Sequence, residues 1–432
     1  MDNTGSQPQY VSVEEAVKLV SSNQRVFVHG GAATPLKLLN ALLDRGRDIH
    51  NVELVAISTY GKINWDRPEV TGSFYLNSLF VSENVRGWVN SPYGEYVPVF
   101  LSEIPQLFDR KVLPVDVALI QVSPPDDHGY CTLGTSADIA VSAVNNARLI
   151  IAQVNPRMPR VMGDGLIHSS RLHAMVWDET VLPEIDYSLK DDAIADQVAA
   201  HVASIVEDGA TLQMGIGTIP DAVLKLLAGH RDLGVHTEML SDGVIPLIQQ
   251  GVINNRNKKV LPGKTVSTFI LGTRKIYDYV DNNPSVNCLA ASFVNDANVI
   301  AGNPKATAIN SAIEVDLTGQ VCADSMGTYQ YSGIGGQMDF MRGAALSEGG
   351  KPIIALPSIT KKGESRIVAN LKQGAGVVTT RGHIHFVATE QGIVNLYGKN
   401  LEQRAKLLIS IAHPSHKEAL EREYRSRFGK LL

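Results

Sequence analysis

The chain has 432 residues, of which 44% are apolar and 19% are charged, an ordinary mixture for a globular protein. This length predicts two or three domains, each with enough apolar core to fold without disulfide staples. The formal net charge is −5 and no basic stripe stands out, which argues against nucleic acid as a partner. The three cysteines, Cys131, Cys288 and Cys322, stand apart without a CxxC pair. Their spacing argues against a disulfide framework or a zinc site and fits a reducing cytoplasm.

The first residues, 1–9, are polar and contain neither a charged n-region nor an apolar h-region, so we expect no secretory signal. Apolar runs such as 149–154 are too short to cross a bilayer. We therefore expect a cytoplasmic protein that has no membrane partner.

Apolar segments rich in β-branched residues alternate along the chain with segments of helical periodicity. In chain order, we predict helices at 13–19 and 36–43, strands at 52–57, 117–122 and 147–154, a helix at 193–205, a strand at 377–380 and a helix at 401–411. This alternation predicts an α/β fold with largely parallel sheets.

One segment near the start of the chain is repeated in its middle. Residues 25–43 read RVFVHGGAATPLKLLNALL, and residues 211–227 read TLQMGIGTIPDAVLKLL. Aligning the two glycine turns places Pro35 on Pro220 and brings two leucine-rich helices into register. A proline that opens a helix after a glycine turn leaves outward N–H groups, which suit a phosphate or a developing oxyanion. A plain tight turn of a parallel sheet has the same residues and remains the alternative.

A second pair of segments repeats at nearly the same offset. Residues 126–129 read DDHG and residues 316–319 read DLTG. The two repeats together indicate a duplication, and they predict two related α/β domains. We place the domains at residues 1–188 and 189–432.

Glu238 is the residue that we single out for chemistry. It lies in the segment 233–243, LGVHTEMLSDG, where a short apolar run ends in a polar turn. Ligands of parallel sheets bind at the carboxyl ends of the strands, although a single glutamate is most often plain surface charge. A carboxylate with an ordinary pKa of about 4.3 is ionised at neutral pH, so it can act as a nucleophile without a partner base.

A second glycine cluster lies at 331–340, YSGIGGQMDF, with three glycines in four residues. Such a run permits close approach of the backbone to a ligand, with a flexible loop as the alternative. Lys361 precedes a glycine turn that could meet phosphates, although lysines in such turns are more often surface charge. His383 and His385 alternate along a predicted strand but have no third ligand nearby, so we expect no metal site.

These segments jointly resemble the acetyl-CoA hydrolase/transferase family, and within it the 4-hydroxybutyrate and butyrate:acetate CoA-transferases. The resemblance covers nearly the whole chain. The motifs that carry it are SPPDDHGYCTLG (123–134), QVNPRMPR (153–160), HTEMLSDG (236–243), EVDLTGQV (314–321), SGIGGQMDF (332–340) and IAHPSHKEAL (411–420).

The resemblance implies two CoA-transferase-type α/β domains with the active site between them. It implies that Glu238 becomes a glutamyl-CoA thioester, and Gly336 N–H is our candidate for the oxyanion donor. The implied CoA-binding residues are Gly215, Ile216, Gly217, Thr218, Ile219, Gly335, Gly336 and Lys361, and the implied pocket or support residues are His29, Gln213 and Glu390. Relatives often have tyrosine where this chain has Gln391, so a contact through that tyrosine is not expected here.

The implied partners are acyl-CoA and small carboxylates, in a homo-oligomer with no cofactor beyond CoA as the substrate. A hydrolase would use the same intermediate and admit water, and a CoA sensor would bind without turnover. A nicotinamide-dependent dehydrogenase is a more distant alternative, because Gly215 and Gly217 open a helix and an acidic residue follows about 20 positions later. Against it, Pro220 stands where that fingerprint has Gly or Ala.

Overall fold

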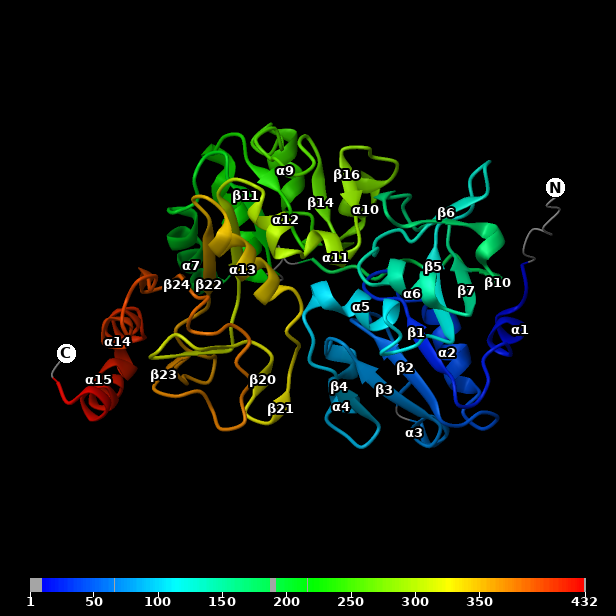
Figure 1. Ribbon diagram of the computed structural model, residues 1–432, viewed down its shortest axis with the longest axis horizontal. Helices are drawn as coiled ribbons and strands as arrows, with labels where there is room; N and C mark the ends of the chain where they lie inside the picture. The colour runs from blue at the N-terminus through cyan, green and yellow to red at the C-terminus, as the bar shows by residue number, and fades with distance from the viewer. Residues whose placement is uncertain (1–9, 66, 187–191, 216, 431–432) are drawn as a thin grey trace. The chain divides into compact units, whose positions relative to one another are not determined.

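The computed structural model describes residues 10–65, 67–186, 192–215 and 217–430 (Figure 1). The chain divides into two compact units, each of which is described by itself below. Unit 1 contains Met1–Ile185, Val266–Val294 and Tyr331–Gly333, and unit 2 contains Asp186–Thr265, Asn295–Gln330 and Ile334–Leu432. The predicted domain boundary between residues 188 and 189 lies outside the described residues and stays a prediction.

Unit 1 is built around a sheet in which all neighbouring strands are parallel, in the order β10-β7-β5-β1-β2-β3-β4. Its strands are β1 (Arg25–Val28), β2 (Val52–Ala56), β3 (Phe74–Ser78), β4 (Gly94–Tyr96), β5 (Val117–Val122), β7 (Leu149–Val154) and β10 (Ala174–Trp177). Its helices are α1 (Val13–Val17), α2 (Leu36–Asp44), α3 (Pro68–Thr71), α4 (Arg86–Val89), α5 (Ile104–Asp109), α6 (Ala140–Asn146), α10 (Arg274–Val280) and α11 (Ala291–Val294). Shorter strands of this unit are β6 (Tyr130–Thr132), β8 (Met162–Gly163), β9 (Leu166–His168), β14 (Thr265–Ser267) and β16 (Val286–Cys288).

Both faces of this sheet are covered by helices. Val26 and Val28 of β1 belong to a core cluster with residues of α1 and α2, whereas Phe27 belongs to a cluster with residues of α5 and α6. A strand that is buried on both faces needs apolar side chains on both, which explains the apolar runs at 26–28 in β1 and 117–120 in β5.

Unit 2 is built around a sheet in the order β12-β11-β17-β22-β24-β25, in which only the last pair is antiparallel. The strands are β11 (Thr211–Met214), β12 (Gly234–Val235), β17 (Ala306–Asn310), β22 (Lys351–Ala355), β24 (Phe386–Thr389) and β25 (Gly392–Asn395). The helices are α7 (Ala193–Ala203), α8 (Thr218–Leu226), α9 (Val244–Gln249), α12 (Ala297–Ala301), α13 (Gln337–Leu346), α14 (Leu401–Ser410) and α15 (Pro414–Phe428). Shorter strands are β13 (Met239–Leu240), β18 (Glu314–Asp316), β19 (Val321–Cys322), β20 (Ser325–Met326), β21 (Tyr329–Gln330) and β23 (Ile367–Val368).

The two units repeat one plan, as the sequence predicts. The run β2-β1-β5-β7-β10 in unit 1 has the same connectivity as β12-β11-β17-β22-β24 in unit 2. In each unit the strand of the repeated segment, β1 or β11, leads through a glycine turn into a helix, α2 or α8. The fold class is therefore α/β, with two related domains and largely parallel sheets.

The second repeat folds into the same turn in both units. Asp126 Oδ1 accepts hydrogen bonds from the backbone N–H groups two and four residues later, at 3.0 and 2.9 Å. Asp316 Oδ1 accepts from the equivalent groups at 2.8 and 3.0 Å. The glycine that follows three residues later has a φ of +82° at Gly129 and +91° at Gly319, a region that favours glycine. Aspartate and glycine recur here because the turn requires both.

Most of the predicted elements are confirmed. Helices are found at α1, α2, α7 and α14, and strands at β2, β5 and β7, with ends within a few residues of the predicted ones. The strand predicted at 377–380 is wrong. Val377 is exposed and Thr379 makes only an isolated bridge to Val321, so the β-branched residues there lie in a loop. The neighbouring strand of the sheet is β24, which begins at Phe386.

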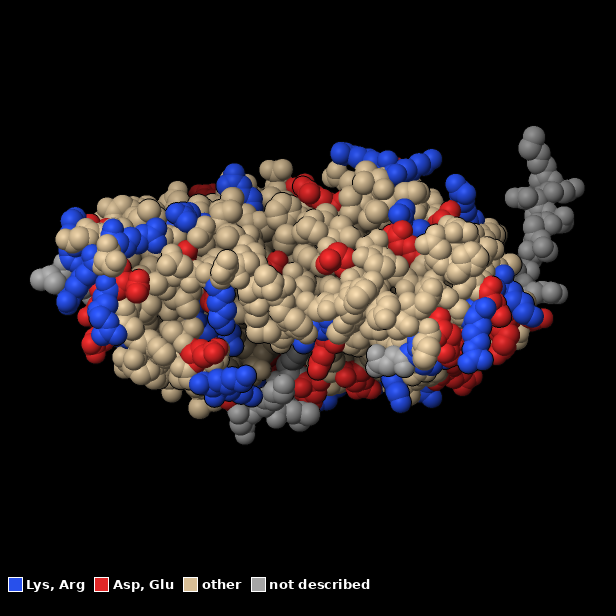
Figure 2. Space-filling view, turned by 90° about the horizontal axis from the view of Figure 1, so that it is seen from below, with Lys and Arg blue, Asp and Glu red and all other residues tan. Residues whose placement is uncertain are grey.

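On the face shown in Figure 2, groups of basic and of acidic side chains are scattered among a larger area of other residues. Within the part of the chain that the structure describes, no helix is both long enough and apolar enough to span a membrane.

Candidate active site

Glu238 lies just beyond the carboxyl ends of β11 and β12. The backbone continues alongside β11 after β12 ends, because the His236 N–H donates to the Leu212 carbonyl at 3.1 Å. Thr237 Oγ1 accepts from the Met214 N–H at 3.2 Å, which fixes the next residue to the same strand end. The side chain of Glu238 is half-buried, so the strands hold it at the edge where ligands of parallel sheets bind.

A buried lysine holds this segment from the other side. Lys258 Nζ donates to the Val235 carbonyl at 2.8 Å and to the Lys264 carbonyl at 2.6 Å. Burial lowers the pKa of Lys258 from its ordinary 10.5 to about 7. The strand that delivers Glu238 is therefore tied to the loop 255–264 by a side chain without charge at alkaline pH.

Gly336 presses against the carboxylate of Glu238. A Cβ added to residue 336 would lie 1.9 Å from Glu238 Oε2 and 2.1 Å from Asn295 Nδ2. Only glycine fits this position. Gly336 is also the N-cap of α13, so the carboxylate lies at a helix N-terminus, where the unpaired N–H groups favour negative charge. The structure thus brings together the two predicted catalytic residues, while the oxyanion role of the Gly336 N–H stays a prediction.

Two further residues belong to this cluster, and neither was assigned a role from the sequence. Asn295 Nδ2 donates to Glu238 Oε2 at 3.3 Å and to Asp339 Oδ2 at 3.2 Å. Asn295 is completely buried and Asp339 is nearly so, in the first turn of α13. Asp339 belongs to the GGQMDF motif, and that motif was the sequence feature from which its role could have been predicted. Asn295 lies between two short helices, and the only local sequence feature near it is Asp296, the N-cap of α12.

The first glycine turn joins β11 to α8. The Gly215 N–H donates to the Ile309 carbonyl at 2.8 Å, which holds the turn against β17. Gly217 is the N-cap of α8, and Thr218 and Ile219 are its first two residues. The predicted CoA contact at Ile216 lies outside the described residues. The turn therefore presents a helix N-terminus, and its binding of CoA stays a prediction.

Gln213 makes a reciprocal amide pair with Asn310. Asn310 Nδ2 donates to Gln213 Oε1 at 2.9 Å, and Gln213 Nε2 donates to Asn310 Oδ1 at 3.4 Å. The pair links β11 to β17 at the edge where Glu238 lies.

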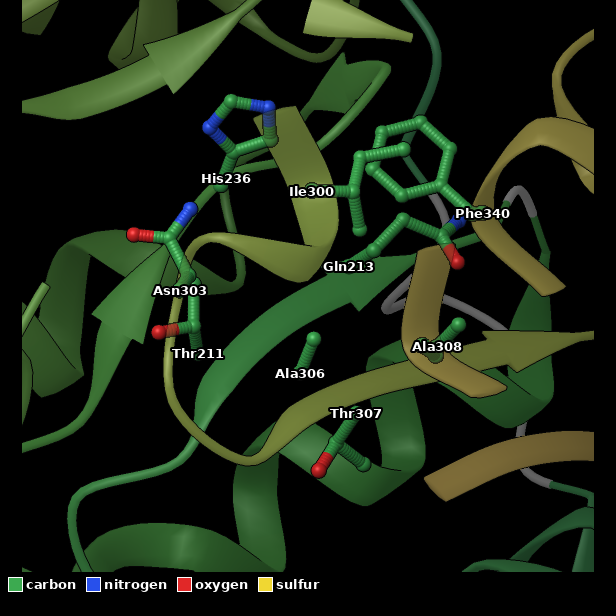
Figure 3. A pocket seen from close by; sticks show the side chains of 10 residues that line it. Thr211, Gln213, His236, Ile300, Asn303, Ala306, Thr307, Ala308 and Phe340 are labelled. Carbon is green, nitrogen blue, oxygen red and sulfur yellow. The ribbon is translucent and has the colours of Figure 1, made fainter. Parts of the chain in front are cut away.

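Gln213 also lines a small cavity, shown in Figure 3. The space open to a water centre is about 10 Å³, near the minimum for one buried water. Thr211 Oγ1 and Asn303 Nδ2 are buried polar atoms of this lining without a hydrogen-bond partner among the described residues. The cavity suits a water and is too small for an acyl group. The lining residues are Thr211, Gln213, His236, Ile300, Asn303, Ala306, Thr307, Ala308, Phe340 and Ala344.

Glu390 is half-buried at the end of β24. The Ser358 N–H donates to its Oε2 at 2.9 Å, and the Ser358 hydroxyl donates to its Oε1. Burial raises the pKa of Glu390, but these hydrogen bonds outweigh it, so the pKa lies below the ordinary value. Lys361 lies on an exposed turn after β22 and forms no ion pair within the described residues. Neither residue is linked to Glu238 by a hydrogen bond of the described structure.

His29 has a structural position inside unit 1. It is completely buried, its Nε2–H donates to the Ser136 carbonyl at 2.7 Å, and its Nδ1 accepts from the Gln121 N–H at 3.3 Å. Burial lowers the pKa of His29, which agrees with a neutral ring. Both ring nitrogens make hydrogen bonds inside unit 1, and the predicted pocket or support role of His29 stays a prediction.

Among the described residues, no group of three or more His, Cys, Asp or Glu side chains is arranged to hold a metal ion. His383 and His385 lie in the loop before β24 rather than along a strand, and His383 Nδ1 contacts the Thr380 hydroxyl at 2.8 Å. All three cysteines are free and buried, and burial raises the pKa of Cys131 and of Cys288 to about 12.

Comparison with known proteins gives the family. The acetyl-CoA hydrolase/transferase N-terminal domain matches residues 3–217, and the C-terminal domain of the same family matches residues 272–424. The chain belongs to the acetyl-CoA hydrolase/transferase family.

Relatives in this family are similar over almost their whole length. A succinyl-CoA:acetate/propanoyl-CoA:succinate CoA transferase from Fasciola hepatica is 50% identical over 95% of this chain and 86% of its own. A 4-hydroxybutyrate coenzyme A transferase from Clostridium kluyveri is 46% identical over 97% of both chains. Among solved structures, RipA from Yersinia pestis is 34% identical with a TM-score of 0.92 over 97% of both chains. A 4-hydroxybutyrate CoA-transferase from Porphyromonas gingivalis is 36% identical with a TM-score of 0.83 over 97% of this chain and 98% of its own.

Proposed function

We propose that this protein is a CoA-transferase that moves CoA between a short-chain acyl-CoA and acetate through a glutamyl-CoA thioester on Glu238. The acyl groups that we propose are 4-hydroxybutyryl and butyryl. The observation that carries the proposal is the Glu238 carboxylate held against Gly336 at the N-terminus of α13, with the Asn295 amide donating to its Oε2.

The reaction runs through two acyl transfers on one carboxylate. A Glu238 oxygen attacks the thioester carbonyl of acyl-CoA, giving an acyl-glutamyl anhydride and CoA thiolate. The thiolate, whose parent thiol has a pKa of about 8.5, attacks the glutamyl carbonyl and releases the first carboxylate. The second carboxylate then runs the same steps in reverse, so Glu238 and every proton return to their starting state.

Each step passes through an oxyanion that needs a donor nearby. Asn295 Nδ2 donates to Glu238 Oε2. In the proposed reaction Oε1 is the attacking oxygen, so Oε2 remains the glutamyl carbonyl oxygen and bears the developing charge when that carbonyl is attacked. The N–H groups of the first turn of α13 are further candidate donors, because Gly336, the N-cap of this helix, lies against the carboxylate. A donor of this kind is worth ~10²–10³ in rate, enough to make anhydride chemistry feasible in a site that excludes water.

The CoA site that we propose is formed by two helix N-termini and one lysine. Gly215, Gly217, Thr218 and Ile219 open α8, and Gly335 and Gly336 open α13. Backbone N–H groups in both turns suit the polar groups of CoA, and Lys361 supplies a positive charge on an exposed turn for its phosphates. Binding of the parts of CoA that lie far from the thioester then supplies free energy that lowers the barrier at the reacting carbonyl. We propose no cofactor beyond CoA.

The hydrolase alternative uses the same residues and differs only in admitting water. An acetyl-CoA hydrolase from Candida albicans is 30% identical over 49% of this chain, a shorter match than those of the transferases. Transferase relatives at 50% and 46% identity favour transfer. The dehydrogenase alternative finds no support, because the family matches cover both halves of the chain and Pro220 lies in the first turn of α8.

The test is to trap the intermediate. Incubation with butyryl-CoA and no acceptor should leave CoA on Glu238, and borohydride should reduce that thioester to an alcohol and inactivate the protein. Kinetics with butyryl-CoA and acetate should be ping-pong, because the first acid leaves before the second binds. A hydrolase would form the thioester and lose it to water, whereas intersecting patterns with no CoA adduct on the Glu238 peptide refute the mechanism. A panel of 4-hydroxybutyryl-, butyryl-, propanoyl- and succinyl-CoA then identifies the acyl group.

We also propose a homo-oligomer in the cytoplasm. The three buried, free cysteines support a reducing compartment. Light scattering of the purified chain measures the oligomeric state, and a single monomeric mass would rule out the oligomer.

A further inference from the structure

The orientation of the Asn295 amide follows from its two neighbours. Its nitrogen lies 3.3 Å from Glu238 Oε2 and 3.2 Å from Asp339 Oδ2. Ionised carboxylate oxygens only accept hydrogen bonds, so the amide must direct its nitrogen, and not its oxygen, toward both. One NH₂ group carries two hydrogens, which is the number that the two carboxylates require.

The other end of the same amide gains nothing from this arrangement. Asn295 is completely buried, and its Oδ1 has no hydrogen-bond partner among the described residues. A buried oxygen without a partner costs free energy, so the orientation is not chosen to satisfy the amide oxygen. A rotation of the amide by 180° would place that oxygen against two carboxylates. The carboxylates therefore set the orientation, and Asp339 supplies half of the restraint.

The restraint from Glu238 weakens during the proposed reaction. When Glu238 becomes an anhydride or a thioester its oxygen loses the negative charge, and hydrogen bonds to neutral acceptors are roughly half as strong as those to ionised ones. Asp339 takes no part in the acyl transfers, so its acceptor oxygen stays the same throughout. It lies in the first turn of α13, where the helix dipole favours a carboxylate. One of the two restraints is thus constant through the cycle.

We propose that Asp339 is a positioning residue that acts through Asn295: it keeps the Asn295 N–H aimed at the Glu238 carbonyl oxygen while Glu238 passes from carboxylate to anhydride and thioester. This inference rests on the proposed function, because it concerns the donor for the oxyanion on Glu238. It assigns the aspartate of the GGQMDF motif a task that its place in a helix does not by itself require.

A double-mutant cycle between Asp339 and Asn295 tests the inference. Asp339→Ala removes the acceptor, so kcat should fall by about 10²-fold, with the KM for butyryl-CoA within about twofold of wild type. Asn295→Ala should lower kcat by a similar factor. The double variant should be no slower than Asn295→Ala alone, because Asp339 has nothing left to position. Asp339→Asn keeps an acceptor oxygen of the same reach and should restore kcat to within a few-fold of wild type.

The outcomes separate positioning from a structural role. A residue that only supports α13 would give additive losses and a lower melting temperature in both backgrounds, and that result overturns the inference. Equal losses for Asp339→Asn and Asp339→Ala also overturn it, because an acceptor oxygen at this position would then restore nothing. Should Asp339→Ala fail to fold, Asp339→Ser replaces it in the cycle, since its hydroxyl stops one bond short of Oδ2.

Asp296→Ala is the matched control. It removes the N-cap of α12 directly beside Asn295, where the Asp296 carboxylate accepts from two backbone N–H groups, without touching the amide. It should lower the melting temperature and leave kcat within about twofold. If the wild-type protein forms no CoA adduct on Glu238, the proposed function itself is refuted. Failure of the proposed function can therefore be distinguished from failure of the inference about Asp339.

Discussion

The substitution of Gly336 by alanine should disable transfer with the smallest possible change in side chain. The added Cβ would lie 1.9 Å from Glu238 Oε2 and 2.1 Å from Asn295 Nδ2, and real Cβ atoms essentially never come within 3.0 Å of such atoms. The carboxylate oxygen must therefore move by at least the difference between 3.0 and 1.9 Å. A displacement of about 1 Å at a reacting group costs ~10²-fold in rate.

We therefore expect Gly336→Ala to lower kcat about 100-fold, with the Kd for CoA within about threefold of wild type, because the displaced atoms react and do not anchor the nucleotide. Initial rates of acetyl-CoA formation from butyryl-CoA and acetate give kcat, and calorimetry gives the Kd. Gly229→Ala is the control in the same unit, since an added Cβ there meets no atom within 4 Å. A Gly336→Ala protein that keeps a third of wild-type kcat would refute the reasoning and leave 331–340 as an ordinary turn. Gly336→Val should be at least as slow.

Further substitutions test the nucleophile, the buried lysine and the repeated turn. Glu238→Ala should abolish transfer while the melting curve stays unchanged, and a variant with a tenth of wild-type activity would contradict its role; Glu238→Asp, one methylene shorter, should lose ~10²-fold in kcat. Because the pKa of Lys258 is lowered from 10.5 to about 7, its share of the stability is present above pH 10.5 and lost as pH falls through 7. In urea unfolding, wild type should thus gain up to about 3 kcal/mol more than Lys258→Met between pH 7 and 9.5, and equal gains would show that Lys258 stays charged. Asp126→Ala removes two hydrogen bonds that hold its turn and should cost about 1–3 kcal/mol, while the same change at the exposed Asp127 should cost less than about 0.5 kcal/mol.

The parts of the fold that could be predicted are those in which one short segment carries its own signal. The strand at 117–122 is apolar except for Gln121 because both faces of the sheet are covered, and that pattern can be read without its neighbours. The run at 377–380 has the same β-branched character, but it lies in a loop. β-propensity shows that a residue suits a half-buried sheet surface, and it does not show that the chain places a sheet there.

The candidate site divides in the same way. Glu238 was predictable because an apolar strand ends beside it in a polar turn, and Gly336 because glycines cluster there. Asn295 was not, because its hydrogen bond to Glu238 spans 57 residues of sequence and no local pattern encodes it. The role of His29 came from the resemblance alone and stays a prediction, because its burial and its two hydrogen bonds inside unit 1 do not test it.

The discontinuity of unit 1 affects the order in which the chain can fold during synthesis. Ala291 of α11 belongs to the apolar core that also contains Ile104 and Phe108, and the Ala291 N–H donates to the Asp138 carbonyl at 2.9 Å. That core therefore stays open after residue 185 has been made, until the ribosome has added the segment that ends at residue 294. At about 5–20 residues per second, the intervening stretch of about 110 residues takes roughly 5–20 s. Throughout that interval the nascent amino-terminal half exposes apolar surface, and we expect chaperones to bind it there.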